Sequence, residues 1–408
     1  MLEESSTRYP GWRVVFVCFV MAVLCWGFGF YGHGFYLAEL HGRFGWPTGL
    51  IAGASTVYYL VSALLVVYIN DLIRVFGIRG SVLAGAGALA LSVALIPLVS
   101  APWQLFAAYL VMACAWATLS VGAITNIVGL WFDRRRGLAI SLALTGASFG
   151  GIAVVPALVF LAQAIGFQRA MLTGAGLILV ILVPLALLVL GPPARSAPDP
   201  AGRTSEPARD RAPVWTRAAA LRSLAFWSVS APFALGLMSQ AGFLVHQIAF
   251  LEPTIGRGAA GVAVGITTAM AVAGRLMLGP MANRLDQRLA SAGSLASQAA
   301  ALAVMANSAD TSVLWAACAV YGLSVGNLIT LPALIVQREF DAASFGMLIG
   351  LSTAISQFTY AFGPGLLGLV RDLSGTYAAS LFLCILLNLT AAVIVLRRPG
   401  GSAVHGRG

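Results

Sequence analysis

Arg275 is the residue whose type and position most strongly predict chemistry. It lies in an apolar run, residues 261–281, that otherwise carries no charge and is long enough to cross a bilayer. An arginine near the middle of a spanning helix costs roughly 2.5 to 3.5 kcal/mol on insertion scales, so an ionisable group at that depth indicates a functional site. No acidic residue lies deep in an apolar run, and an anionic substrate is therefore a candidate partner. The alternative is that Arg275 extends towards the inner surface, because Asn283 lies only eight residues further on.

Other polar side chains within the apolar runs could line a pathway for such a substrate. Histidine titrates near neutral pH and could carry a coupling proton, and amides or tyrosine hydroxyls could bind a carboxylate. For each of them the alternative is ordinary helix packing or anchoring at the membrane surface. The candidates for substrate contact besides Arg275 are Tyr31, His33, Asn126, His246, Asn327, Gln357 and Tyr360.

The composition places these residues in a membrane protein. The chain has 408 residues, of which 59% are hydrophobic and 9% charged, and its mean hydropathy is +0.90. These values fit no soluble globular class and predict an all-α protein that crosses the bilayer many times. The first run is too long for a signal peptide, so we expect it to be retained as a span. Twelve spanning runs are predicted at residues 13–37, 48–70, 80–99, 103–130, 138–163, 170–190, 222–250, 259–281, 288–307, 312–336, 344–370 and 377–396.

The basic residues predict the orientation of these spans. All 24 basic residues are arginine, and the net charge is +10. If both termini are cytoplasmic, nineteen arginines fall on cytoplasmic segments and only Arg43, Arg169, Arg257 and Arg371 fall outside. This bias follows the positive-inside rule, so the basic balance reflects membrane orientation and not nucleic-acid binding. Heavy use of alanine, glycine and arginine without lysine indicates a bacterial protein of the inner membrane.

A polar stretch divides the spans six and six. We predict an N-terminal six-helix bundle at residues 1–190, a cytoplasmic linker at 191–220 that is rich in proline and arginine, a C-terminal six-helix bundle at 221–398 and a short tail at 399–408. The halves share a serine-valine-glycine element at residues 120–122 and 324–326, and each element precedes a Phe-Asp pair. Duplicated six-helix halves are typical of transporters. Recurring glycines in the fifth and eleventh runs predict close helix packing.

Motifs at the cytoplasmic ends of the runs resemble a known family. They are Gly11-Trp12, RVFGIR at 74–79, WFDRRRGLA at 131–139, and Gly274-Arg275 leading to Gly279, Ala282, Asn283 and Arg284. Together they resemble the major facilitator superfamily, and more narrowly its monocarboxylate-transporter branch, which includes bacterial oxalate/formate-type antiporters. The resemblance implies twelve helices in two pseudo-symmetric halves and a substrate carboxylate bound by Arg275. A guanidinium matches a carboxylate with two parallel hydrogen bonds, which agrees with that role.

The chain departs from this branch at two places. Ala271 stands where many monocarboxylate transporters have an aspartate that couples protons, and Gln357 and Tyr360 lie on the helix where oxalate-type exchangers have a lysine. A single deep cation suits a monoanion better than a dianion. The resemblance also implies gating latches at the cytoplasmic rim, whereas the alternative is that these residues only orient the spans; the latch candidates are Asp71, Arg74, Arg79, Asp133, Arg135, Asn283 and Arg284.

These observations predict a secondary active transporter of a small organic anion that works by alternating access, and the resemblance implies a monocarboxylate. We expect a monomer with no cofactor or metal, with protons as a candidate co-substrate. One rival is an exporter of drug-like or cationic compounds, which is disfavoured because no buried acid is present. Another rival is a membrane sensor that binds a ligand without moving it. A membrane-embedded enzyme is disfavoured because His33, His41, His246 and His405 do not fall within ligand spacing of acids or cysteines on one helix.

Overall fold

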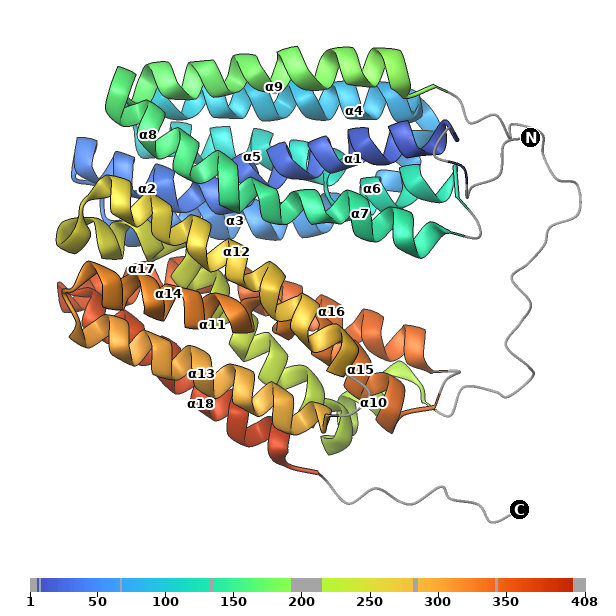
Figure 1. Cartoon of the computed structure of the whole chain (residues 1–408), viewed down its shortest axis with the longest axis vertical. Coiled ribbons are helices and arrows are strands. Elements are labelled where there is room, and N and C mark those ends of the chain that lie inside the picture. Colours follow the sequence, from blue (N-terminus) through green and yellow to red (C-terminus); the bar gives the residue numbers. More distant parts are fainter. Residues whose placement is uncertain are drawn as a thin grey trace, which may run out of the picture. The chain divides into compact units, whose positions relative to one another are not determined.

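The structure is a computed structural model that describes residues 6, 9–66, 68–132, 135–191, 215–281, 285–341 and 344–398. Side chains are described in these ranges except at 70–71 and 279–281. Ordered structure in these ranges is helical throughout, which confirms the predicted all-α class (Figure 1).

Twelve helical segments in the described residues are long and apolar enough to cross a membrane, as predicted. Each overlaps one predicted run; about half are several residues longer than the run, the second and eighth are shorter, and the twelfth has the predicted bounds. The segments are Gly11–Phe44, Thr48–Val66, Leu72–Leu98, Pro102–Gly129, Arg136–Ile165, Phe167–Val189, Leu224–Ile255, Arg257–Leu278, Gln287–Asn307, Thr311–Glu339, Phe345–Ser374 and Tyr377–Leu396.

Five of these spans consist of two α-helices in series. In the first and fifth spans a π-helical turn joins the two parts. The serial elements are α1 (Gly11–Trp26), η1 (Gly27–Tyr31) and α2 (Gly32–Phe44); α5 (Pro102–Leu119) and α6 (Val121–Gly129); α7 (Arg136–Phe149), η3 (Gly150–Val154) and α8 (Val155–Ile165); α14 (Thr311–Val325) and α15 (Asn327–Glu339); and α16 (Phe345–Ala361) and α17 (Gly363–Ser374).

The remaining described elements include one short helix, α10 (Arg217–Arg222), which precedes the seventh span. The others are α3 (Thr48–Val66), α4 (Ile69–Leu95) with the 3-10 turn η2 (Ile96–Leu98), α9 (Phe167–Val189), α11 (Leu224–Ile255), α12 (Arg257–Met281), α13 (Gln287–Asn307) and α18 (Tyr377–Leu396).

The repeated serine-valine-glycine element coincides with a helix break in each half. Ser120 separates α5 from α6 and has extended backbone angles, with φ −87° and ψ −165°. Gly326 separates α14 from α15, although its angles stay in the right-handed helical region. The sequence repeat therefore marks the same structural event at corresponding places along the two halves. Interrupted spans at corresponding positions are a feature of transporter folds.

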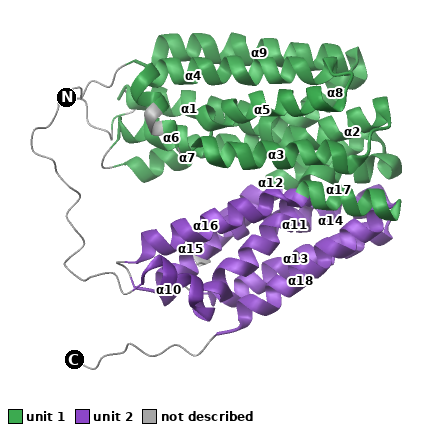
Figure 2. Cartoon of the chain, turned by 180° about the vertical axis from the view of Figure 1, so that it is seen from behind, with its two compact units in different colours: residues 1–199, 244–269, 364–375 green, residues 200–243, 270–363, 376–408 purple. Residues whose placement is uncertain are grey.

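The described chain forms two compact units, shown in Figure 2. Unit 1 comprises residues 1–199, 244–269 and 364–375, and unit 2 comprises residues 200–243, 270–363 and 376–408. Helices α11 and α12 each continue from one unit into the other, and α17 belongs almost wholly to unit 1. Residues 192–214 and 399–408, which hold most of the predicted linker and the whole predicted tail, lie outside the described residues.

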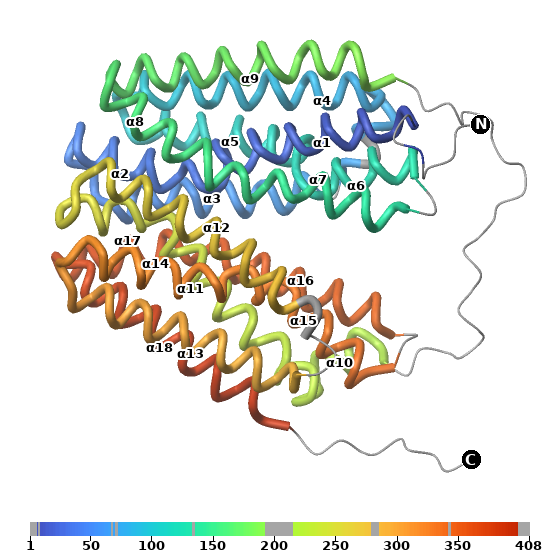
Figure 3. Tube along the Cα trace, viewed as in Figure 1, coloured from blue at the N-terminus to red at the C-terminus, as the bar shows by residue number. Residues whose placement is uncertain are grey.

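Glycines allow close helix packing in unit 1. A Cβ atom at Gly150 would lie 2.6 Å from the backbone nitrogen of Gly27 and 2.7 Å from the carbonyl oxygen of Val23. The backbone of η3 therefore lies directly against the end of α1 and the start of η1, which any larger side chain would prevent. In the same unit α4 and α9 run side by side (Figure 3).

Unit 2 has a continuous apolar core and a buried polar tie. The amide nitrogen of Asn388 on α18 donates to the Ser239 hydroxyl on α11 at 2.9 Å and to the Cys384 carbonyl at 3.0 Å. Asn388 is fully buried, so these bonds satisfy an amide nitrogen that would otherwise be costly in an apolar interior. The larger buried members of the core are Phe226, Val229, Phe233, Leu295, Leu328, Leu331, Ile335, Leu348 and Val395.

The loop predicted between the second and third spans is mostly helical. Helix α4 begins at Ile69 and leaves helical geometry only at Gly77, where φ is +69° and ψ is 168°. Glycine adopts positive φ at little cost because it lacks a Cβ atom, so the chain changes direction at one residue while its neighbours stay helical. The boundary of the third span was therefore placed too late by hydropathy alone.

Candidate functional site

Arg275 lies on α12 in unit 2, and its side chain is partly exposed. Its Nε atom donates to the carbonyl oxygen of Ala271, one turn earlier, at 3.3 Å. This bond fixes the stem of the side chain along its own helix. Ala271 thus contributes its backbone oxygen to the position of Arg275.

The tenth span holds Arg275 in place through its helix break. A Cβ atom at Gly326 would lie 2.5 Å from Cγ of Arg275 and would also meet the Ala271 carbonyl oxygen. One residue earlier on α12, Gly274 lies against the Leu323 carbonyl on α14. Two glycines on facing helices therefore let α12 approach the junction of α14 and α15 closely enough for the arginine stem to lie across it.

Polar side chains continue from this junction into unit 2. The Asn327 amide, next to Gly326, donates to the Ser294 hydroxyl on α13 at 3.5 Å, and the Ser297 and Ser324 hydroxyls are hydrogen-bonded. Asn327 follows Gly326 in the sequence, and its amide points to Ser294 on α13. The other unit 2 candidates lie on α16, where Gln357 is exposed and Tyr360 is partly buried.

The four remaining candidates lie in unit 1 in varied settings. His33 is fully buried, with Nε2 3.4 Å from the sulfur of Met112 and its ring against Tyr58 and Tyr109. Such a position favours packing inside the unit. His246 is buried on α11, with Nε2 3.0 Å from the Pro364 carbonyl oxygen. Asn126 donates to the Gly122 carbonyl oxygen of its own helix at 3.0 Å. Tyr31 packs edge-on against Phe30.

Only part of the predicted cytoplasmic latch set is described. Arg74 and Arg135 are exposed, and Arg79 donates from Nε to the Leu190 carbonyl at 2.8 Å. The Asp71 side chain and residues Asp133, Asn283 and Arg284 lie outside the described residues. The latch role of the whole set therefore stays a prediction.

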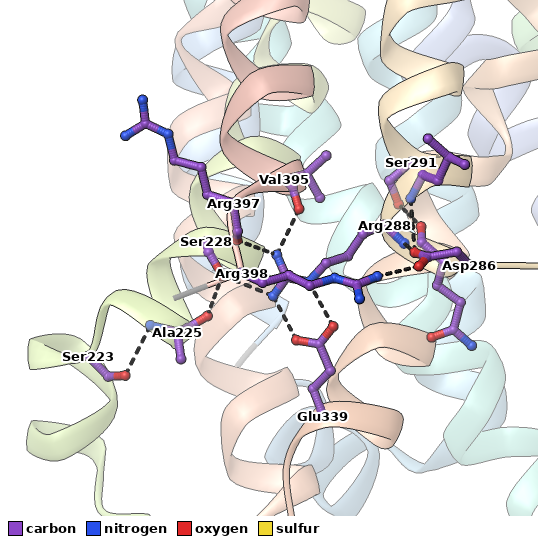
Figure 4. A network of polar contacts seen from close by, with 12 residues as sticks. Ser223, Ala225, Ser228, Asp286, Arg288, Ser291, Glu339, Val395, Arg397 and Arg398 are labelled. Carbon is purple, nitrogen blue, oxygen red and sulfur yellow. Dashed lines mark hydrogen bonds and ion pairs between the residues drawn. The ribbon is translucent and has the colours of Figure 1, made fainter. Parts of the chain in front are cut away.

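A well-developed ion network in unit 2 surrounds Arg288 (Figure 4). The guanidinium is 3% exposed and binds both oxygens of Glu339, each at 2.7 Å. It also donates to the Val395 carbonyl at 2.7 Å, the Arg397 carbonyl at 3.0 Å and the Ser228 hydroxyl at 3.0 Å. One arginine thereby ties α13 to α15, to the end of α18 and to α11. From the sequence, Arg288 is an orientation signal or, by resemblance to the family, a member of the cytoplasmic latch clusters; its contacts within unit 2 were not predicted.

Asp286 forms the exposed edge of this network. Its carboxylate caps α13 by accepting from the backbone nitrogens of Arg288 at 3.0 Å and Leu289 at 3.2 Å, and it pairs with Arg398. The Leu289 backbone bond, followed by Arg398, lowers the pKa of Asp286. A carboxylate at a helix N-terminus is stabilised in its ionised form by these donors.

A second ion cluster lies in unit 1 and was missed in the sequence. NH1 of Arg257 lies 2.5 Å from Glu39, and its Nε lies 2.7 Å from Glu252. Glu39 belongs to α2, whereas the other two residues flank the turn between α11 and α12. The available sequence signal was the position of all three residues at the ends of predicted runs on the same predicted side of the membrane.

Asp372 on α17 adds a further contact in unit 1. Its carboxylate accepts from the backbone nitrogens of Thr48 at 3.1 Å and Gly49 at 2.7 Å, and from the Thr48 hydroxyl at 2.9 Å. It thereby caps the first turn of α3 from a helix more than 300 residues away in the chain. The close approach depends on two glycines, because a Cβ atom at Gly368 would lie 2.6 Å from the Cα of Gly49.

Twelve potential spans in the described residues, several of them interrupted, and a charged residue within one span are features typical of membrane transporters. Residues 17–364 match the model of the Major Facilitator Superfamily, and the chain belongs to that family. Its relatives are transporters and not enzymes. The resemblance to this superfamily is thereby confirmed.

Curated relatives include monocarboxylate transporters. The chain is 28% identical to human "Monocarboxylate transporter 11" over 298 residues, which cover 70% of this chain and 60% of that protein. The mouse protein of the same name is 28% identical over 304 residues, covering 71% and 65%. An Aspergillus niger protein, "MFS-type transporter pynF", is 27% identical over 250 residues, covering 59% and 54%. The matches therefore span less than two thirds of each relative.

A solved structure shows the same fold. It is described as a bacterial homolog to the human lysosomal transporter Spinster in an inward-facing and occupied conformation. The TM-score is 0.72 at 12% sequence identity, and the match covers 96% of each chain. At this identity the likeness concerns the fold alone, and it confirms the predicted major facilitator architecture.

Proposed function

We propose that this protein is a secondary active transporter that moves a small organic monoanion, a monocarboxylate, across the membrane by alternating access. The observation that carries the proposal is the placement of Arg275 in a spanning helix, partly exposed, with its stem supported by the helix break at Gly326. A guanidinium held in this way loses little side-chain entropy when it binds a carboxylate through two hydrogen bonds. The names of the human and mouse relatives support the same substrate class.

The remaining site residues of the proposal have graded roles. Asn327 is the strongest second contact because it follows Gly326 directly, and Gln357 and Tyr360 are candidates on α16. We assign Tyr31, Asn126 and His246 to the same pathway. His33 takes part only if the packing around Met112 rearranges, because the structure leaves its side chain no exposed surface.

The membrane and orientation also belong to this proposal. We infer the bacterial inner membrane from the composition and cytoplasmic termini from the distribution of arginines. We also propose a monomer, with protons as a candidate co-substrate.

Transport by proteoliposomes tests the proposal. Purified full-length protein is reconstituted and given labelled lactate, pyruvate, an aromatic acid and one dicarboxylate, with and without an inward proton gradient. We expect saturable uptake of a monocarboxylate by the wild type and its loss in Arg275→Gln. Arg169 is exposed and lies on a predicted outside loop, whereas Arg275 lies within a span. The variant Arg169→Gln is the matched control and should transport normally.

A glycine substitution tests the support of Arg275 without removing its charge. Gly326→Ala should raise the substrate KM by roughly tenfold or more, because a misplaced guanidinium loses about 1.4 kcal/mol or more of binding. The matched control is Gly293→Ala on α13, where a Cβ atom would meet no neighbour within 4 Å. Carboxylate uptake that is indifferent to both Arg275→Gln and Gly326→Ala would contradict the proposed anchor. Absence of any carboxylate uptake would favour the exporter and sensor alternatives.

A further inference from the structure

The ion cluster of unit 1 joins helices from the two ends of the sequence. Glu39 lies near the end of α2, and Arg257 is the first residue of α12. Their 2.5 Å contact is accompanied by the 2.7 Å contact between Arg257 and Glu252 at the end of α11. The side chain of Glu39 is 10% exposed, whereas those of Glu252 and Arg257 are 25% and 31% exposed.

The cluster carries one more negative charge than positive charge. Two carboxylates share a single guanidinium, so neither receives the full stabilisation of a one-to-one ion pair. Glu39 is the more buried of the two acids, and it holds Arg257 through a charge-assisted hydrogen bond that a proton on its carboxylate would remove.

The chain connectivity makes the two ion pairs unequal. Glu252 and Arg257 flank a tight turn at Gly256, where φ is +79°, so they stay close to each other whichever way the helices move. Glu39 lies on a helix more than 200 residues earlier in the chain, and only its contact with Arg257 breaks when α2 and α12 separate. Arg257 would then keep one carboxylate, whereas Glu39 would keep no cation among the contacts described.

We propose that Glu39 is a proton-binding site that links closure of this end of unit 1 to the pH of the adjoining solution. When ionised, its carboxylate accepts the hydrogen bond from Arg257 and holds α2 against α12. When a proton from water binds the carboxylate, the charge that attracts Arg257 is lost and the contact is released. Acidification therefore favours separation of the two helices, and alkaline solution favours closure.

This inference rests on the proposed function only in assuming that the closure is part of a transport cycle. By the distribution of arginines, this end is the outer one. The pH of the outside solution would then control how often the transporter opens to it. The device needs no aspartate before Arg275, which is consistent with Ala271 at that position.

Other charged and titratable groups lie at the same end of unit 1. His41 on α2 is 3.5 Å from Arg371 on α17 and 2.8 Å from the Trp46 carbonyl oxygen. His41 is the main rival, because its protonation beside Arg371 would also weaken closure. Three further groups on nearby elements have hydrogen-bond partners: Arg43 donates to the Pro97 carbonyl, Asp372 caps α3, and His246 is bonded to the Pro364 carbonyl. The tyrosines on η1 and α3 are Tyr31, Tyr58 and Tyr59.

A distance measurement in the full-length protein tests the site without any substrate. Spin labels are attached to Gln168→Cys on α9 and Thr254→Cys on α11, both exposed, with the exposed Cys114 replaced by serine. The protein is placed in lipid nanodiscs and measured between about pH 8 and about pH 5, a range that includes histidine and raised carboxylate titrations. We expect the population with the longer distance to grow as the pH falls.

Three variants give signed outcomes. Glu39→Gln imitates the protonated acid and should show the longer distance at every pH. Glu252→Gln leaves Glu39 the whole guanidinium, so the transition should move to lower pH by roughly one unit or more. Asp372→Asn removes the cap on α3 and should favour the longer distance generally while preserving the response to pH.

Specific results would overturn the inference. A wild-type distance that does not change with pH would do so, and so would a pH response that survives Glu39→Gln. A response abolished by His41→Gln but retained in Glu39→Gln would assign the effect to the rival group. None of these outcomes depends on carboxylate transport, so failure of the proposed substrate class and failure of this site remain distinguishable.

Discussion

The two ion networks, one around Arg257 in unit 1 and one around Arg288 in unit 2, differ in how completely their arginines are satisfied. Arg288 is 3% exposed and has five hydrogen bonds to four other residues, including both oxygens of Glu339. Arg257 has a side chain that is 31% exposed and holds two competing carboxylates. The first arrangement stabilises one structure, whereas the second can exchange a partner at small cost.

The sequence separation of the partners supports the same distinction. Every partner of Arg288 lies in the C-terminal half, between Ser228 and Arg397. Arg257 pairs with one residue of its own corner and one from the first span. The contact between Arg257 and Glu39 can change during alternating access without unfolding either helix. The contacts of Arg288 cannot be lost without leaving its buried charge without partners.

The largest expected effect is on the Arg288 network. Arg288→Ala removes the donor to two carbonyl oxygens and to the Glu339 carboxylate, whose side chain is 35% exposed, and hydrogen bonds to a charged group contribute about 1.5 to 3 kcal/mol each. We expect a marked loss of thermal stability in detergent, measured by a fluorescence melting curve. If Arg288→Ala melted within a degree of the wild type, the network would not have the structural role assigned to it.

A smaller effect is expected at the unit 1 cluster. Arg257→Gln removes two ion pairs whose arginine is 31% exposed, compared with 3% for Arg288, and exposed pairs typically contribute about 1 kcal/mol or less. The melting temperature should therefore fall much less than in Arg288→Ala, while the spin-label distance in unit 1 should lengthen and lose most of its dependence on pH. A stability loss equal to that of Arg288→Ala would remove the distinction between the two networks.

The smallest effect is expected at the exposed edge of the Arg288 network. The pKa of Asp286 is lower in the folded state than its ordinary value of 3.8. The capping carboxylate therefore stabilises the folded state fully at pH values above 3.8, and this contribution is lost as the pH falls through the lower folded-state pKa. Asp286→Asn should melt slightly below the wild type near neutral pH, with the difference shrinking at acidic pH. Arg398→Gln removes only the exposed partner of Asp286 and should lower the free energy of unfolding by less than about 1 kcal/mol. A difference that grew at low pH would contradict this sign.

The candidate site shows which local features were predictable. Residues such as Arg275 and Asn327 were found because a polar residue in an apolar run is costly and therefore informative. Their support by Gly274 and Gly326 was not predictable, because a glycine in a spanning run gives no indication of which helix it faces. Glu39 and Glu252 were passed over because acids near the ends of spans are common and gain meaning only from their partner.

The sequence by itself determined that this protein is an all-helical membrane transporter with twelve spans, since hydrophobic length and the family motifs are local properties of the chain. It also held a repeated motif that coincides with helix breaks in the fourth and tenth spans. The tertiary structure alone decided which charges meet. Ion pairing between Glu39 and Arg257, and capping of Thr48 by Asp372, join residues separated by more than 200 positions, and only packing of the helices brings such residues within hydrogen-bonding distance.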